Sequence, residues 1–356
     1  MTRLELLREN MLAEDLDAII LFGEHNARYI TDLAFSDGFV FVTGNTAHIF
    51  TDFRYFEVAE RTVSRDFTVI ADRARTDTVR SIIKEQGISS VGVEIDTIAY
   101  SAYLKLKEDY PTVALRSCDD ILLKMRRIKS SSEIELIKTA QSITDRAFSA
   151  VLKRIKPDMS EIELAAEIEY NMRLLGADGP AFDTIAVSGA SSALPHGVPE
   201  NKRLERGFLT MDFGAKYKGY CSDMTRTVVI GKADDEMKKL YNTVLAAQIA
   251  ALDKIKAGAD LAAADAYARD VIDSFAEYKG SFGHSLGHGV GLEVHEAPSL
   301  SPRMSGRCLL EGEVVTVEPG IYLYGKYGCR IEDMVQIRRD GVYNFTSSTK
   351  DLIEIL

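Results

Sequence analysis

The stretch "LTMDFGAKYKGYCSDMTRTVVI", residues 209–230, decides the fold, because it places an aspartate in each of two adjoining apolar segments. Apolar and polar side chains alternate over residues 209–213, which predicts a half-buried strand, and residues 220–230 predict a second strand after a short turn. A charged side chain inside an apolar strand needs a partner. Asp212 and Asp223 are therefore the first candidates for a functional site.

The predicted hairpin brings these two carboxylates face to face. If the turn is centred on Tyr217 and Lys218, Asp212 lies directly opposite Asp223, with Cβ atoms about 4.5–5.5 Å apart. Two carboxylates at that distance repel each other, so one of them stays protonated at neutral pH unless a positive charge lies between them. The hairpin predicts either a bound cation or a shared proton.

A second hairpin repeats this arrangement near the end of the chain. The segments "IKPDMSEIELAAEIE" from Ile155 and "IKAGADLAAADAYAR" from Ile255 each follow a long amphipathic helix, open another helix and precede strand-rich sequence. In "VVTVEPGIYLYGKYGCRIEDMVQI", a turn about Gly325 places Glu318 opposite Glu332. We predict a duplicated helix–helix–sheet unit whose two hairpins bring four carboxylates together.

Four clustered carboxylates would be neutralised by two divalent cations. Oxygen-rich ligation with few nitrogens suits Mn²⁺, Co²⁺ or Fe²⁺, and carboxylates that bridge two metals about 3.5–4 Å apart serve metal-assisted hydrolysis. A single nitrogen ligand would complete such a set. Four of the six histidines lie in "ALPHG" and "SFGHSLGHGVGLEVHE", and these are His196, His284, His288 and His295.

The spacing of His284 and His288 resembles a helical zinc motif, but Ser285 stands where the catalytic glutamate of that motif would be. Glycines at 283, 287, 289 and 291 also disfavour a helix there. They predict a strand or loop packed closely against another backbone or a ligand.

Each carboxylate also has a purely structural interpretation. An aspartate in a strand is often an edge or turn residue, and Glu318 precedes Pro-Gly, which suits a turn. Glu332 and Asp333 are adjacent, so they point to opposite faces of their strand and only one of them faces the site. His196 alone would more often be a loop residue than a catalytic one.

The N-terminal part of the chain predicts an α/β domain. Strand-like segments alternate with segments after Asp52, Thr76 and Thr97 that read as helices. The strand-like segments are "DAIILF", "GFVFVT", "AHIF", "FTVI", "VGVE" and "TVAL".

The domain boundary is predicted close to Lys129. There a long helix begins, and Ser132-x-x-Glu135 can form a capping box at its start. The chain therefore divides into an N-terminal domain, residues 1–125, and a C-terminal domain, residues 126–356.

The composition fits a soluble globular protein of two domains, with 356 residues, 46% hydrophobic and 27% charged. A net charge of −11 excludes a nucleic-acid partner that needs a basic surface. The longest apolar run near the N-terminus, residues 18–22, is too short for a signal peptide or a membrane span. The four cysteines lack C-x-x-C spacing, so we expect reduced thiols and a cytoplasmic location.

The motifs together resemble those of the Xaa-Pro peptidases, the pita-bread metallopeptidases that include prolidase and aminopeptidase P. "SALPHG", "DFGAKYKGYCSDMTRT", "GHSLGHGVGLEVHE", "VEPGIY" and "RIED" occur in the order and spacing of that family, over residues 130–356. "NARYITDLAFSDG" and "TDFRY" resemble its creatinase-type N-terminal domain. The resemblance implies a creatinase-like α/β domain followed by an α+β pita-bread domain with an internal pseudo-twofold repeat.

The resemblance also implies roles for individual residues. The five ligands of a dinuclear site would be Asp212, Asp223, His288, Glu318 and Glu332, with Asp223 and Glu332 contacting both metals. His196, His284 and His295 would surround the substrate and steady the tetrahedral intermediate, beside Arg330 and Tyr322. Two divalent ions per subunit are implied, with Mn²⁺ expected first and Co²⁺ as the alternative.

The implied mechanism is hydrolysis of the Xaa-Pro bond by a hydroxide between the metals, with Glu318 as general base. His196 and His295 would donate hydrogen bonds to the developing oxyanion, worth ~2.7–4 kcal/mol per donor. Arg330 and His284 are candidates for binding a substrate carboxylate. The alternative for Arg330 is that it orients Glu332 or a neighbouring ligand.

Our first expectation is a cytosolic Xaa-Pro dipeptidase that acts on small peptides. The alternatives are aminopeptidase P activity on longer peptides and a non-catalytic pita-bread binding protein. The resemblance further implies a homodimer in which the N-terminal domain of one subunit narrows the active-site mouth of the other.

Overall fold

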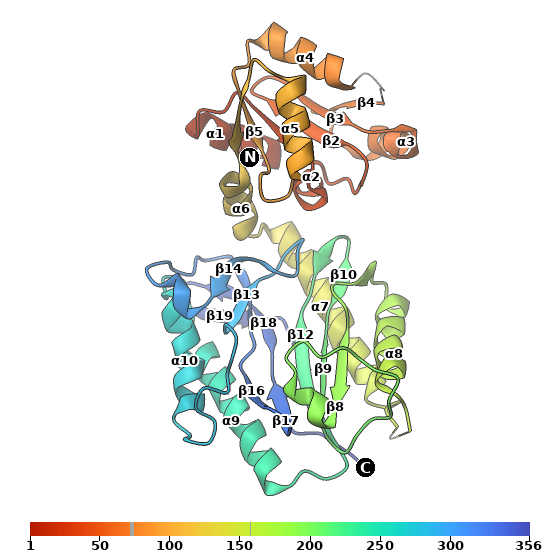
Figure 1. Cartoon of the computed structure of the whole chain (residues 1–356), viewed down its shortest axis with the longest axis vertical. Helices are drawn as coiled ribbons and strands as arrows, with labels where there is room; N and C mark the ends of the chain where they lie inside the picture. Colours follow the sequence, from red (N-terminus) through yellow and green to blue (C-terminus); the bar gives the residue numbers. More distant parts are fainter. Residues whose placement is uncertain (72–74, 157) are drawn as a thin grey trace. The chain divides into compact units, whose positions relative to one another are not determined.

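The computed structural model describes residues 1–71, 75–156 and 158–356. Within them the chain forms two compact units, Met1–Arg126 and Arg127–Leu356, and each has its own sheets and core (Figure 1). No described helix has both the length and the apolar character needed to span a membrane.

The first unit is built on a six-stranded mixed sheet with the order β4-β3-β2-β1-β5-β6. The strands are β1 (Ala18–Leu21), β2 (Phe39–Thr43), β3 (Ala47–Phe50), β4 (Thr68–Ile70), β5 (Ser90–Val93) and β6 (Ala114–Ser117). The helices are α1 (Arg3–Ala13), α2 (Glu24–Thr31), α3 (Phe53–Thr62), α4 (Arg75–Gln86), α5 (Tyr100–Asp109) and α6 (Asp119–Arg127). The predicted alternation of strands and helices is confirmed.

The centre of this sheet is apolar on both faces. Every residue of β1 is buried, which is expected for a central strand covered on both sides. β1 pairs in parallel with β5 and antiparallel with β2. The rings of Phe39 and Phe50 stack with centroids 4.7 Å apart, within the same core as Ile20 and Val93.

The second unit contains the predicted repeat. Its first copy consists of α7 (Ser131–Val151), α8 (Glu161–Leu174), β8 (Ile185–Ser188), β9 (Gly207–Phe213) and β12 (Met224–Ile230). Its second copy consists of α9 (Asp235–Leu252), α10 (Leu261–Asp273), β13 (Gly287–Gly289), β15 (Val314–Val317) and β18 (Asp333–Arg338). Figure 1 shows one helix pair on each side of the strands, and each pair lies in a separate hydrophobic core. The core of α9 and α10 also includes Phe208 and Val229 from the strands of the first copy.

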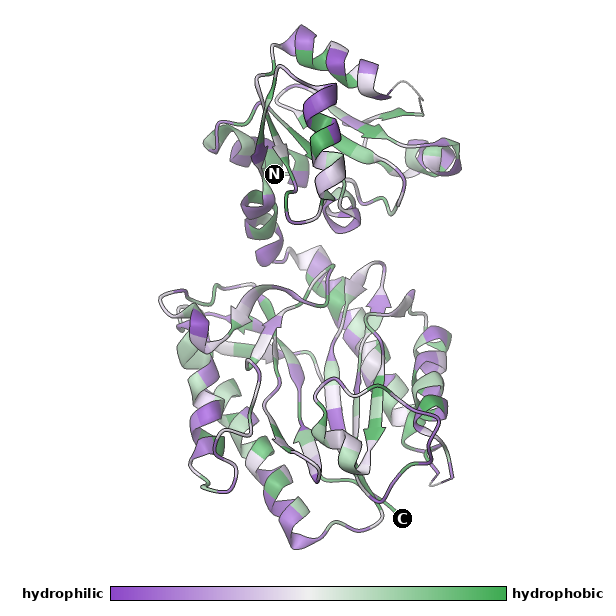
Figure 2. Cartoon of the chain, in the orientation of Figure 1, coloured by the Kyte–Doolittle hydropathy of each residue, from purple (hydrophilic) through white to green (hydrophobic). Residues whose placement is uncertain are grey.

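The two sheets of this unit have the orders β20-β12-β9-β8 and β14-β13-β15-β18-β19. They are completed by β14 (Glu296–Leu300), β19 (Gly341–Asn344) and β20 (Glu354–Ile355). Small ribbons extend the hairpins: β7 (Gly179–Pro180), β10 (Ala215–Tyr217) and β11 (Tyr220–Cys221) in one, β16 (Gly320–Leu323) and β17 (Tyr327–Arg330) in the other. The helices in Figure 2 alternate between hydrophilic and hydrophobic residues, as expected for elements with one buried face.

The predicted cap of the long helix α7 is wrong by two residues. The N-cap is Ser130, whose hydroxyl accepts from the backbone N–H of Glu133, and the Glu133 carboxylate accepts from the N–H of Ser130 at 2.9 Å. The buried Glu133 carboxylate also accepts from the Tyr220 hydroxyl at 3.0 Å, and this tertiary contact favours the observed register. Ser132 lies in the first turn of the helix instead, and Glu135 lies just after that turn.

The register of the first hairpin also differs from the prediction by two residues. Asp212 pairs with Thr225, not with Asp223, because the turn consists of Lys218 and Gly219. Both turn residues have positive φ, 46° and 85°, which a two-residue hairpin turn needs and which glycine supplies without strain. A shift of two residues leaves every side chain on the same face of the sheet.

The second hairpin has the predicted register. Val317 pairs with Asp333 on one side of the glutamates, and Gly320 pairs with Arg330 on the other. Glu318 therefore lies opposite Glu332, as the sequence predicted.

Candidate metal centre

A cavity of about 250 Å³ in the second unit collects the predicted site residues. Its lining consists of Phe182, Ile185, Pro195, His196, Asp212, Asp223, His284, Ser285, His288, His295, Glu318, Arg330 and Glu332. Only Tyr322 among the predicted residues is absent from the lining, and its hydroxyl lies 2.8 Å from His284 Nε2 and 2.7 Å from Arg330 Nη1.

The potential ligand atoms of three of these residues lie close together. One oxygen of Asp223, one of Glu332 and one ring nitrogen of His288 are all within 4.8 Å of one another. His288 Nε2 lies 3.6 Å from Asp223 Oδ2 and 3.3 Å from Glu318 Oε1. The side chains thus converge as ligands of a shared cation would.

Glycines allow β13 to carry His288 into this cluster. A Cβ at Gly287 would lie 2.1 Å from the carbonyl oxygen of Thr316, and one at Gly289 would lie 2.2 Å from that of Ala297. Only glycine permits such close backbone packing, as the sequence predicted for these two positions. His288 Nδ1 lies 3.1 Å from the Gly289 carbonyl, a partner that suits an N–H at Nδ1 and leaves Nε2 to face the carboxylates.

Two buried carboxylate oxygens have no hydrogen-bond partner among the described residues, Asp212 Oδ1 and Glu332 Oε1. The second oxygen of each carboxylate has a partner. Asp212 Oδ2 accepts from Arg330 Nη2 at 2.6 Å, and Glu332 Oε2 accepts from the Thr225 hydroxyl at 2.8 Å. A buried acceptor without a partner is costly, and a cation would remove that cost. The residues present therefore fit a divalent metal.

The electrostatics of the carboxylates lead to the same conclusion. Burial, followed by the charges of Glu332, Asp212 and Glu318, raises the pKa of Asp223 well above its usual value. Burial, followed by the charges of Glu318 and Asp212, likewise raises the pKa of Glu332. Without metal, ionising all these carboxylates together is therefore costly.

Glu318 and His288 behave as an ion pair within this cluster. Burial alone would raise the pKa of Glu318, but its hydrogen bond with His288 and the imidazolium charge outweigh it and lower the pKa to about 2. Burial would lower the pKa of His288, and the same hydrogen bond reverses that effect. The Thr316 hydroxyl donates to Glu318 Oε1 at 3.1 Å and fixes the carboxylate.

The remaining histidines border the cluster. The ring of His295 meets that of His288 edge-on, with centroids 4.2 Å apart, and burial lowers the pKa of His295. Burial also lowers the pKa of His284, whose Nδ1 lies 2.9 Å from the Ser285 carbonyl. Both rings are therefore neutral at pH 7 and can each donate one N–H. His196 lines the same cavity.

Arg330 is held by the protein on every side. Its Nε donates to the Thr225 hydroxyl at 2.9 Å, and its Nη1 donates to the Pro195 carbonyl at 3.2 Å and to the Tyr322 hydroxyl. Its Nη2 donates to Asp212. These contacts use four of the five N–H groups of a guanidinium, so a bidentate grip on a further carboxylate would require one of them to break.

Sequence reasoning missed Thr225 and Thr316, whose hydroxyls bind ligand carboxylates. The signal was present, because each threonine lies two positions from a predicted ligand, Asp223 or Glu318, and so shares its strand face. The apolar lining by Phe182, Ile185 and Pro195 was also missed.

Family models match both units. The model for metallopeptidase family M24 matches residues 135–339, and that for the Creatinase/Prolidase N-terminal domain matches residues 3–128. The chain belongs to metallopeptidase family M24. Its fold is a creatinase-type N-terminal domain followed by a pita-bread catalytic domain, as the sequence predicted.

Similar proteins match the M24 chain along its whole length. An Xaa-Pro dipeptidase from Bacillus anthracis is 42% identical with a TM-score of 0.93, covering 99% of both chains. An X-Pro aminopeptidase from Thermotoga maritima is 37% identical with a TM-score of 0.92, covering 100% of both. An Xaa-Pro dipeptidase from Pyrococcus horikoshii is 38% identical over 347 residues, 97% of each chain.

The pKa shifts predict how metal removal changes the stability of the M24 chain. Raised pKa values at Asp223 and Glu332 mean that the metal-free folded state loses stability as the pH rises above about 4. Metal competes with protons for these carboxylates and binds more tightly as the pH rises. We expect chelation to lower the melting temperature, Mn²⁺ to restore it, and the gap to widen from about pH 5 to about pH 8.

Scanning fluorimetry of metal-free and Mn²⁺-loaded samples measures this gap. The matched control is Asp223→Asn, which removes one of the repelling charges. Without metal it should melt above the wild type at about pH 8, and it should gain little from Mn²⁺. If a sample verified to be metal-free melts at the same temperature before and after Mn²⁺ is added, the result would argue against a clustered site.

Proposed function

We propose that this M24 metallopeptidase hydrolyses the bond between any residue and a following proline, with Xaa-Pro dipeptides as its first substrates. The observation that carries the proposal is the convergence of Asp223, Glu318 and Glu332 from two hairpins, and of His288 from β13, into one cavity. The similarity of the whole chain to proteins named Xaa-Pro dipeptidase supports the choice of substrate.

We propose that two divalent ions, Mn²⁺ before Co²⁺, are held by Asp212, Asp223, His288, Glu318 and Glu332. Oxygen-rich ligation with one imidazole suits these metals. The orphaned oxygens of Asp212 and Glu332 support this assignment. When bound, such ions polarise the scissile carbonyl and acidify water.

The chain's own residues supply the proton chemistry and the positioning. The Glu318 carboxylate, which accepts a hydrogen bond from the Thr316 hydroxyl, lies in the cavity and can accept a proton from the attacking water. His295, neutral because of burial, can donate its N–H to the developing oxyanion, and we give His196 the same role. His284, which lines the cavity, then faces the substrate, and the Tyr322 hydroxyl 2.8 Å from its Nε2 helps to hold the ring.

The substrate bond explains why a dedicated enzyme exists. A proline nitrogen carries no N–H, so a peptidase that grips that hydrogen cannot use the bond. The apolar side of the cavity, formed by Phe182, Ile185 and Pro195, offers contact surface instead of a hydrogen-bond acceptor. This lining supports recognition of apolar groups such as a prolyl ring.

Aminopeptidase P activity on longer peptides is the second candidate, and the similarity to an X-Pro aminopeptidase at 37% identity favours it. Steady-state kinetics on matched Xaa-Pro, Xaa-Pro-Xaa and Xaa-Ala peptides distinguishes the two. We expect Mn²⁺-loaded enzyme to cleave Xaa-Pro with the highest kcat/KM and to leave Xaa-Ala intact. Preference for the tripeptide would replace the first candidate by the second, and cleavage of none would contradict both.

We propose that Arg330 orients Asp212 and Tyr322, because its donors are engaged with them and with Thr225. Arg330→Ala should then lower kcat/KM about 10–100-fold on Xaa-Pro and on Xaa-Pro-Xaa amides alike, and weaken Mn²⁺ binding. Arg330→Lys, which keeps the charge but loses the planar fork, should recover little activity. A loss confined to the dipeptide, with metal content unchanged, would instead assign Arg330 to the substrate carboxylate.

We further propose that the protein is a homodimer, which rests on the family resemblance. We also propose a cytoplasmic location, because the sequence contains no C-x-x-C pair. Multi-angle light scattering at assay concentration should give about twice the monomer mass. A fully active monomer would remove any role of a partner subunit in shaping the active-site mouth.

A further inference from the structure

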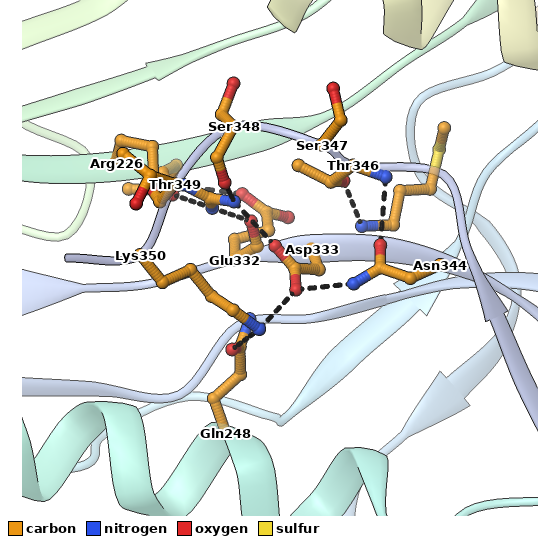
Figure 3. Close-up of polar contacts among 12 residues, drawn as sticks. Arg226, Gln248, Glu332, Asp333, Asn344, Thr346, Ser347, Ser348, Thr349 and Lys350 are labelled. Atoms are coloured by element: carbon orange, nitrogen blue, oxygen red, sulfur yellow. Dashed lines mark hydrogen bonds and ion pairs between the residues drawn. The ribbon is translucent and has the colours of Figure 1, made fainter.

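A polar cluster surrounds the buried carboxylate of Asp333, the residue that follows Glu332, and Figure 3 shows its contacts. We call it the Asp333 cluster, and it consists of Arg226, Asp333, Asn344 and Lys350. The Asp333 carboxylate accepts hydrogen bonds from Arg226 Nη2, Lys350 Nζ and Asn344 Nδ2, each at 2.8 Å. Asp333 is 0% exposed and Arg226 is 1% exposed, so the pair between them is removed from water.

One guanidinium joins this cluster to the candidate metal ligand. Arg226 Nη1 donates to the backbone carbonyl of Glu332 at 2.5 Å and to that of Thr225 at 3.0 Å. The Glu332 N–H donates to the same Thr225 carbonyl at 3.1 Å, and the Thr225 hydroxyl donates to the Glu332 carboxylate. Arg226 therefore fixes the main chain on both sides of the contact that aims Glu332 into the cavity.

The C-terminal segment completes the cluster. Arg226 Nη2 donates to the Ser348 carbonyl and Nε to the Thr349 carbonyl, and Lys350 Nζ reaches Gln248 Oε1 on α9 at 2.8 Å (Figure 3). Residues 347–350 thus contribute one cation and two carbonyl oxygens at the point where the two copies of the repeat meet.

The stability of the fold does not account for such a cluster. Buried ion pairs are expensive to desolvate, and apolar replacements of similar volume are often neutral or stabilising. What a hydrogen-bonded ion cluster provides is fixed geometry, since each partner holds the next at a set distance and angle. The geometry fixed here is the backbone of Glu332.

We propose that the Asp333 cluster positions Glu332 for a divalent cation, with Lys350 as the member supplied by the C-terminal segment. This inference rests on the proposed function, because it assumes that Glu332 is a metal ligand. Arg226, Asp333 and Lys350 are positioning residues that act through the Glu332 main chain. Loss of the Lys350 charge would leave Asp333 less firmly held and would loosen the carboxylate that the cation meets.

The experiment is calorimetric titration of metal-free full-length protein with Mn²⁺. Lys350→Met keeps the aliphatic stem and removes the ammonium group, and we expect it to weaken Mn²⁺ binding about 10-fold. Lys350→Arg should restore most of the affinity. Asn344→Ala removes the neutral hydrogen bond to Asp333, together with the acceptor of the Thr346 N–H, and should weaken binding by a smaller factor. It provides a second variant that keeps both cations of the cluster.

The matched control is Asp145→Asn on α7. Asp145 binds the neighbouring part of the C-terminal segment through the N–H groups of Ser347 and Ser348, at 3.1 and 2.9 Å, but touches no member of the cluster. Its loss should lower the melting temperature and leave Mn²⁺ affinity at the wild-type value.

The outcomes separate the alternatives. Wild-type Mn²⁺ affinity in both Lys350→Met and Asn344→Ala would overturn the positioning role and leave the cluster as structure only. Equal weakening in Asp145→Asn and Lys350→Met would also overturn it, because general loosening of the segment would then be the cause. Wild-type protein that binds no Mn²⁺ would overturn the proposed metal site itself, and the role of the cluster with it.

Discussion

Mutual repulsion among buried carboxylates is the constraint on which the catalytic unit depends. Asp223 and Glu332 are 4% and 1% exposed, and burial together with the charges of neighbouring carboxylates raises the pKa of each. A fold that brings such groups together without metal carries a free-energy penalty, which other interactions must offset until a cation is bound. The packing around the cavity can be understood as the means of holding this repulsive arrangement in place.

Duplication is the simplest way to build such an arrangement. The two helix pairs lie in separate hydrophobic cores, and the core of the second pair also takes in Phe208 and Val229 from the first copy's strands. Each hairpin is therefore supported by packed helices. The hairpins then meet along β12, the end of β17 and the chain that follows it. The Thr227 hydroxyl exchanges hydrogen bonds with the backbone of Arg330, and the Thr225 carbonyl accepts from the N–H of Glu332. Two stable sheets can hold four carboxylates close, whereas a single flexible loop could not.

The sequence predicted those features that depend on alternation within one strand. Glu318 and Glu332 could be placed opposite each other because their hairpin turns about Gly325. The side-chain period of two then puts both carboxylates on the same face. Asp212 and Asp223 were placed on the correct face, but their pairing was wrong by two residues. The reason is local: the turn consists of Lys218 and Gly219, whose positive φ values the predicted centre did not take into account.

Features that depend on tertiary contacts lay beyond the sequence. The sequence "SSSEIE" contains two S-x-x-E patterns, so the sequence alone allows a cap at either of two serines, and the prediction of Ser132 was wrong. The contact between Glu133 and Tyr220 favours the other one. Arg330 was predicted beside the last ligand, yet its four protein partners come from four separate segments. No sequence pattern predicts the contact between Lys350 and Asp333, because residues 347–350 belong to no helix or strand whose period could place them.

Two pairs of adjacent residues, whose side chains point to opposite faces, connect the cavity with the Asp333 cluster. In β12, Thr225 donates to the Glu332 carboxylate, while Arg226 points to the other face of the strand and joins the Asp333 cluster. In the second hairpin, Glu332 points to the cavity while Asp333 points away and receives that same arginine. The alternation that made Glu332 and Asp333 look like rival candidates in the sequence instead gives them complementary positions. One face of each strand carries the chemistry, and the other carries the contacts that hold the strand where the chemistry requires it.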